Sequence, residues 1–138
     1  MAAALLRRRL DGAGIAAEVG SAGTGAWDGA PVSEGAYLVS LEHGIDLSDH
    51  VARLLTRELV DEADLLLTMA RHHRSRVEEL GGSGKAHLLG EYAGEGGAGA
   101  EVNDPFGGEI EAYRAAFDQL ERLIEPAVDR LVKECAGD

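Results

Sequence analysis

Apolar residues near the end of the chain follow the period of an α-helix. From residue 110 to residue 131 they recur at steps of three and four, with charged and polar residues between them. This spacing predicts a single long amphipathic helix over residues 109–134. Pro126 lies inside it, and a kink is expected there because proline cannot donate a backbone hydrogen bond. The apolar stripe consists of Ile110, Tyr113, Phe117, Leu120, Ile124, Val128 and Leu131.

Shorter patterns upstream alternate between helix and strand. Composition and spacing predict helices over residues 2–10, 31–42, 56–60 and 71–82. Thr56 is expected to cap the helix at 56–60. Strands are predicted over residues 17–22, 63–69 and 85–89. The run "ADLLLTM" at 63–69 does not alternate with polar residues, which is typical of a strand covered on both faces. The order of elements predicts an α/β fold in three layers, a small parallel sheet with helices on both faces.

Composition and charge restrict the classes of protein to which the chain can belong. Its 138 residues, 45% of them apolar and 28% charged, suffice for one globular domain. No apolar run approaches the roughly 20 residues that cross a bilayer. The opening "MAAALLRRRL" has its apolar and basic parts in the wrong order for a secretory signal. A formal net charge of -12 argues against a broad basic surface for nucleic acid or membrane, so we expect a cytoplasmic protein.

Glycine accumulates in residues 90–108, and this segment carries an acid directly before a proline. A glycine-rich stretch of such length inside one domain is usually either functional or disordered. Pro105 restricts the backbone of Asp104, while the glycines upstream leave the segment free to move. This arrangement suits a carboxylic acid that is delivered to a reacting group. The alternative is that Asp104 and Pro105 simply open a turn.

Four stretches in a fixed order, followed by a long terminal helix, carry a family resemblance. They are "SAGTGAW" (21–27), "GIDLSDHVARLLTRELVDEADLLLTM" (44–69), "LLGEY" (88–92) and "DPFGG" (104–108). The ordered set resembles the low-molecular-weight protein tyrosine phosphatase family over essentially the whole chain. "DPFGG" is closer to the arginine phosphatase branch than to the "DPYYG" of tyrosine-directed relatives. The resemblance implies a four-stranded parallel sheet and hydrolysis of phosphotyrosine or phosphoarginine on proteins through a phosphocysteine intermediate.

The family's nucleophile has no counterpart among these residues. Relatives carry the catalytic cysteine and a phosphate-binding arginine in a C-x5-R-S-P loop between the first strand and the first helix. This chain begins with "MAAALL", which resembles the helix that follows that loop. We therefore expect residues 1–138 to be one domain, shortened at its N-terminus and inactive by itself. The first strand would lie between the strands at 17–22 and 63–69, so its absence would leave two unpaired edges.

Single residues carry over from the resemblance with roles attached. Asp104 would protonate the leaving group as general acid and then act as base for the hydrolytic water. Ser21 and His50 match positions that hold the nucleophile loop in shape, although His50 could equally be an ordinary core or surface histidine. Trp27 and Phe106 match positions that line the substrate pocket, and the alternative for Trp27 is a packing role.

Other motifs are weaker. "RHHR" at 71–74 suggests a metal site, but adjacent histidines are expected on different sides of a helix, without acidic or cysteine partners at ligand spacing. "GSGK" at 82–85 lacks the flanking glycine and the following serine or threonine of a phosphate loop. The single cysteine, Cys135, excludes an internal disulfide, and nothing after it would activate its thiol. We expect no metal ion and no cofactor.

Two other functions stay open beside a phosphatase acting on a phosphorylated protein. Arsenate reductases share the architecture but need resolving cysteines, and Cys135 is unsuitably placed. A non-catalytic binding remnant that starts at Met1 is the third hypothesis. With two unpaired sheet edges it would be marginally stable or would associate.

Overall fold

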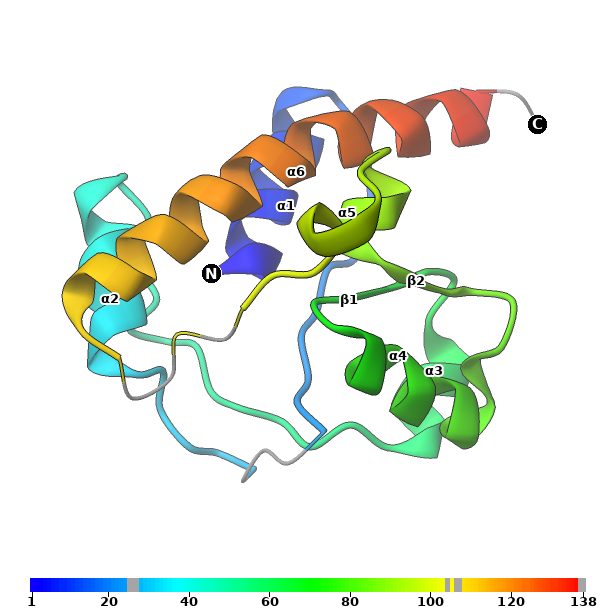
Figure 1. Cartoon of the computed structure of the whole chain (residues 1–138), viewed down its shortest axis with the longest axis horizontal. Coiled ribbons are helices and arrows are strands. Elements are labelled where there is room, and N and C mark those ends of the chain that lie inside the picture. The colour runs from blue at the N-terminus through cyan, green and yellow to red at the C-terminus, as the bar shows by residue number, and fades with distance from the viewer. Residues whose placement is uncertain (25–27, 104, 106–107, 137–138) are drawn as a thin grey trace.

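The computed structural model describes residues 1–24, 28–103, 105 and 108–136. Its longest element is α6 (Ile110–Ala136), and both α1 (Ala2–Gly12) and α2 (Glu34–Glu42) pack against it. Figure 1 shows α6 crossing in front of α1, with α2 beside its first turns. The long helix predicted from the apolar stripe is therefore confirmed, and it continues through Pro126.

The apolar stripe of α6 forms the centre of the hydrophobic core. Phe117 is 0% exposed and Val128 2%, and both belong to one core cluster with residues of α1 and α2. Ile110 and Leu131, at the two ends of the stripe, are only partly buried against that cluster. Burial of this face, rather than helix propensity, supplies most of the stability of such a helix.

Two short strands form the sheet in the described residues. The strands β1 (Leu66–Thr68) and β2 (Ala86–Leu88) run parallel, with Leu67 opposite His87. The crossover between them contains α4 (Arg71–Val77), as a parallel pair requires. Figure 1 shows α3 and α4 on one side of the strands and α5 and α6 on the other. The predicted α/β fold with helices on both faces of a small parallel sheet is confirmed, although both strands are shorter than expected.

The remaining helices agree with their sequence signals. The helix α3 (Arg57–Glu62) begins after Thr56, whose hydroxyl oxygen accepts a hydrogen bond from the Leu59 N–H at 3.3 Å. The cap predicted at Thr56 is confirmed. The charged helix predicted over 71–82 divides into α4 and a π-helical turn (Glu78–Gly82), where Gly81 has a φ of 101°. Glycine accepts this left-handed backbone without strain, so the helix ends there.

The predicted strand over residues 17–22 is wrong. These residues form no strand in the structure, and the nearest pairing is an isolated parallel bridge between Gly23 and Leu54. A short apolar stretch becomes a strand only where a neighbouring strand supplies hydrogen bonds along its length. Here the neighbouring backbone meets it at a single residue.

The glycine-rich segment contains more helix than its composition predicted. Residues 89–92 form α5 (Leu89–Tyr92), and a 3-10 helix follows at Gly97–Ala100. Tyr92 is buried and donates a hydrogen bond from its hydroxyl to Glu134 on α6 at 2.7 Å. The guanidinium of Arg130 lies 4.1 Å from the centre of the Tyr92 ring. Tyr92 thus fastens the start of this segment to α6.

No helix in the described part of the chain is long and apolar enough to span a membrane.

Candidate active site

The segments around Ser21 and His50, far apart in the sequence, lie against each other in the structure. The Gly23 N–H donates to the Arg53 carbonyl and the Leu55 N–H to the Gly23 carbonyl, each at 2.9 Å. Further along, the Ala52 N–H donates to the Ala30 carbonyl at 2.7 Å. These backbone bonds join residues 20–24 and 28–31 to residues 50–55, and we call these described residues the paired loops.

Asp28 gives the paired loops a side-chain contact of their own. Its carboxylate oxygen accepts a hydrogen bond from the Leu54 N–H at 2.7 Å. The Nε of Arg53 donates to the Ser21 carbonyl at 3.2 Å, which gives Arg53 a structural role that its sequence did not indicate. Ser21 itself is exposed. The predicted role of Ser21 in supporting a nucleophile loop stays a prediction.

His50 occupies a more enclosed position at the edge of the paired loops. It is partly buried, and its backbone N–H donates to the Leu47 carbonyl at 3.0 Å. Burial lowers the pKa of His50 below its ordinary value of 6.5, and the positive charges of the Met1 amino group and Arg7 lower it further. The imidazole is therefore mostly neutral at pH 7. A neutral ring can donate one hydrogen bond and accept another, as a loop support would.

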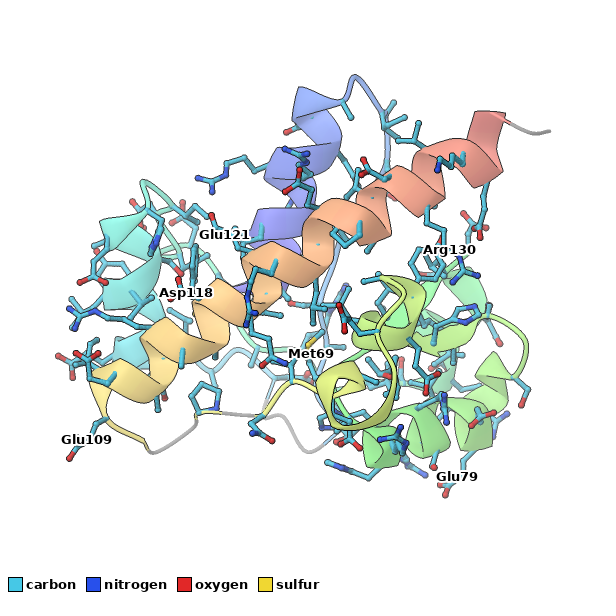
Figure 2. The ribbon with its side chains drawn as sticks, turned by 45° about the horizontal axis from the view of Figure 1, so that its top comes forward. Met69, Glu79, Glu109, Asp118, Glu121 and Arg130 are labelled. Atoms are coloured by element: carbon cyan, nitrogen blue, oxygen red, sulfur yellow. The ribbon has the colours of Figure 1, made fainter. Side chains whose placement is uncertain are left out.

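The backbone just before the candidate acid is fixed to the C-terminal end of β1. The Val102 N–H donates to the Met69 carbonyl at 2.8 Å, one residue beyond that strand. The Glu101 carbonyl accepts a hydrogen bond from Nε2 of Gln119 on α6 at 3.0 Å. Figure 2 shows Met69 beneath the middle of α6. Residues 100–103 form what we call the acid segment, and it is held from both sides.

Two further contacts complete this attachment. Ala100 is 0% exposed and lies against Gly90 of α5. A Cβ added to Gly90 would overlap the Ala100 backbone, so only glycine allows this close approach. The carboxylate of Glu101 forms an ion pair with Arg71 at the start of α4. The acid segment thus contacts α4, α5 and α6.

Three predicted site residues fall outside the described residues: Asp104, Phe106 and Trp27. Asn103 and Pro105, which flank Asp104 in the sequence, are described. Cys135 lies in the last turn of α6. It is the only cysteine in the sequence.

A hollow of about 410 Å³ is lined in part by Gly108, which follows the candidate acid in the sequence. It opens between the start of α2 and the start of α6, and Leu38, Gly108, Ile110 and Tyr113 are among the residues that line it. A built Cβ at Gly35 would overlap the Tyr113 ring, so glycine is required for α2 to pack closely at this wall. Ser33 and Glu34 also line it, so its walls combine apolar and polar side chains.

Sequence reasoning missed the residues that hold the acid segment. Arg71 and Arg74 were considered as part of a metal motif, but both pair with Glu91 of α5, at 3.6 Å and 3.1 Å. Their spacing of three along a helix places them on one face, and this signal could have identified them. Gln119 gave no such signal. The expectation that His72 and His73 point to different sides is wrong, because their ring centres lie 4.1 Å apart.

Comparisons with known proteins agree on one family. Residues 1–136 match the family model described as low molecular weight phosphotyrosine protein phosphatase. The chain is 37% identical over 135 residues to a protein-arginine-phosphatase of Geobacillus stearothermophilus, covering 97% of this chain and 88% of that protein. It is 33% identical over 133 residues to the probable low molecular weight protein-tyrosine-phosphatase EpsP of Ralstonia nicotianae, covering 95% and 86%.

A solved structure extends the likeness to three dimensions. The crystal structure of a YwlE mutant from Bacillus subtilis superposes with a TM-score of 0.86 at 34% identity, covering 94% of this chain and 87% of that one. The likeness therefore includes the arrangement of the elements as well as the residues.

Proposed function

The chain belongs to the low molecular weight phosphotyrosine protein phosphatase family, and we propose that it is part of a cysteine-dependent phosphatase in which Asp104 is the general acid and base. The class of reaction is hydrolysis of a phosphate group from a protein side chain. The family and the named relatives support this class.

The proposed reaction has two steps. A cysteine thiolate attacks the phosphorus atom and forms a P–S bond, while the bond from phosphorus to the substrate oxygen or nitrogen breaks. The leaving atom takes that electron pair and receives the proton of Asp104, without which it would depart poorly. Water then attacks the phosphocysteine, Asp104 accepts a proton from it, and the P–S bond breaks to release inorganic phosphate and the thiolate.

The observation that carries the proposal is the anchoring of the acid segment at the C-terminal end of β1. In open parallel sheets, ligands bind beyond the carboxyl ends of the strands. The Val102–Met69 hydrogen bond and the Gln119–Glu101 hydrogen bond fix the backbone two and three residues before Asp104. A general acid gains from such support because small displacements of a reacting group are costly.

Residues 1–138 contain no cysteine at the position where the family carries its nucleophile. Cys135 is the only cysteine, and it lies at the end of α6, more than 30 residues after the acid segment. We propose that residues 1–138 alone do not turn over substrate, and that the thiolate comes from a segment encoded upstream of Met1. In the other hypothesis the chain is a binding remnant.

The first experiment compares residues 1–138 with the product of the same gene extended by its upstream codons. We expect hydrolysis of at least one of two peptides, one with phosphoarginine and one with phosphotyrosine, only from the extended protein. In that protein, Asp104→Asn should lower kcat by about two to four orders of magnitude. Asp129→Asn, an exposed acid on α6, is the matched control and should leave kcat unchanged.

Each outcome of that experiment tests a different part of the proposal. Full activity in the Asp104→Asn protein would remove Asp104 from the mechanism. Activity in residues 1–138 alone would show that the nucleophile lies among them. An inactive extended protein would favour the binding remnant.

The choice of substrate follows from the residues after Asp104. The "DPFGG" stretch favours phosphoarginine, with Phe106 as the wall of the pocket beside the side chain and Trp27 at its entrance. Initial rates on phosphoarginine and phosphotyrosine peptides of one sequence test this directly. A preference for phosphotyrosine would overturn the substrate assignment and leave the reaction class intact.

We also place the protein in the cytoplasm, with a phosphorylated protein as its partner. A single cysteine fits a reducing compartment, and a net charge of -12 does not favour nucleic acid or anionic membrane.

A further inference from the structure

A histidine and two acids meet on the face where α2 packs against α6. His43 follows the last residue of α2, and Asp118 and Glu121 lie one turn apart on α6. One potential metal-binding atom from each of the three lies within 4.8 Å of those of the other two. Figure 2 shows both acids on the stretch of α6 that lies beside α2. This cluster is independent of the acid segment and of the proposed phosphatase reaction.

The His43 ring is held in one orientation. Its Nδ1 lies 3.1 Å from the Val39 carbonyl oxygen, and because a carbonyl only accepts, Nδ1 carries the proton in this hydrogen bond. The neutral ring therefore keeps the lone pair of Nε2 for another partner. The ring also stacks on Phe117, with ring centres 4.0 Å apart and planes at 22°. Metal-binding histidines usually donate their second N–H to a backbone carbonyl or a carboxylate in this way.

The two carboxylates can move toward a shared ion. Both Asp118 and Glu121 are exposed, so their side chains have room to turn. Ligand atoms about 2.1 Å from a tetrahedral zinc ion are about 3.4 Å apart, so atoms that now lie within 4.8 Å of one another must approach by up to about 1.4 Å. One imidazole and two carboxylates are ligands that zinc accepts, with water in the fourth position. Calcium prefers six or more oxygen ligands and is poorly served here.

One positive side chain competes for this position. Arg8 of α1 has a nitrogen atom 3.9 Å from the Glu121 carboxylate, and it donates a hydrogen bond to the His43 carbonyl at 3.0 Å. An exposed ion pair at this distance is weak, so a divalent ion that bonds directly to Glu121 can replace it. The arginine then opposes the ion only by charge repulsion.

We propose that His43, Asp118 and Glu121 form a binding site for a divalent transition-metal ion of the zinc type. The ion joins the end of α2 to the middle of α6. Its ligands His43 and Asp118 are 75 residues apart in the sequence. Because the ion binds only where both helices are in place, it stabilises the folded protein.

Titration of the purified, metal-free protein with zinc chloride in a non-coordinating buffer tests the site by calorimetry. We expect a stoichiometric site that His43→Gln and Asp118→Asn each weaken by about tenfold or more. The matched controls are His72→Gln, an exposed histidine on α4, and Asp129→Asn, an exposed acid on α6. Both controls should bind zinc as the wild type does. Zinc should raise Tm in the wild type and the controls more than in the two site variants.

Removal of Arg8 provides a test in the opposite direction. Arg8→Gln should tighten zinc binding, because it removes the competing charge, leaves the three ligand side chains unchanged and keeps an amide that can donate to the His43 carbonyl. Binding that is unchanged or weaker in this variant would exclude Glu121 as a ligand and overturn the three-ligand site. Equal zinc binding by the wild type and Asp118→Asn, whose changed side chain is exposed and should not disturb folding, would also overturn it. Loss of binding in His72→Gln alone would assign the ion to α4.

Discussion

Two parts of the molecule, the helices packed around α6 (the helical half) and the paired loops (the weaker half), are stabilised by different interactions. In the helical half, formed by α1, α2, α5 and α6, Phe117 and Val39 are 0% exposed. In the paired loops, Val51 is 57% exposed and Leu54 39%, and hydrogen bonds of the backbone and of the Asp28 and Arg53 side chains join the segments. Each such bond contributes only about 1 kcal/mol net, whereas burial of one large apolar side chain contributes about 1.5–3 kcal/mol. The helical half is therefore the stable scaffold.

The candidate catalytic residues are divided between these halves. Gly90 and Gln119, which contact the acid segment before Asp104, belong to the helical half. Ser21 and His50, the predicted supports of a nucleophile loop, belong to the paired loops. The acid segment, residues 100–103, is therefore attached to the stable scaffold, while Ser21 and His50 lie in the weaker half. This difference leads to three predictions.

Truncation of the core should separate the halves most clearly. Phe117→Ala removes a fully buried ring and should lower the free energy of unfolding by about 3–5 kcal/mol. Leu54→Ala in the paired loops is the control and should change it by no more than about 0.5 kcal/mol. Urea denaturation followed by circular dichroism measures both. Equal losses would show that the loops are as well packed as the core.

A substitution at Gly90 should show whether the acid segment depends on the scaffold. Gly90→Ala forces a methyl group against the Ala100 backbone, and we expect a loss of about 1–3 kcal/mol in the free energy of unfolding. Gly96→Ala is the matched control in the same segment, because nothing lies within 4 Å of a built Cβ there and its φ is -122°. A neutral Gly90→Ala variant would mean that the acid segment can move away from α5.

The smallest effect concerns pH and the paired loops. Since the pKa of His50 is lower in the folded protein than its ordinary 6.5, the unfolded chain binds more protons just below pH 6.5. The free energy of unfolding should therefore fall as the pH is lowered from 6.5 toward the folded pKa, and become insensitive to His50 above 6.5.

His50→Gln should reduce this slope without abolishing folding, as measured by urea denaturation at several values between pH 5 and pH 8. His72→Gln is the control and should keep the slope of the wild type. An identical slope in His50→Gln would show that the histidine is not enclosed by the paired loops in solution.

Much of the helical half could be predicted because its signals are local. A stripe with steps of three and four indicates both a helix and the face it buries, and Thr56 before Leu59 carries its own capping group. The order of short apolar runs and helices indicated the parallel pair β1 and β2. The strand predicted over 17–22 failed because strand formation depends on a partner that local sequence does not reveal.

The family resemblance, the α/β class and the identity of the candidate acid could all be inferred from the amino-acid sequence. Those depend on residue type, order and spacing along one chain. The tertiary structure alone revealed that Gln119 contacts the backbone of Glu101 and Arg71 its side chain, and that His43 meets Asp118 and Glu121. The physical reason is that these contacts join segments tens of residues apart, and their geometry exists only after the apolar face of α6 has been buried.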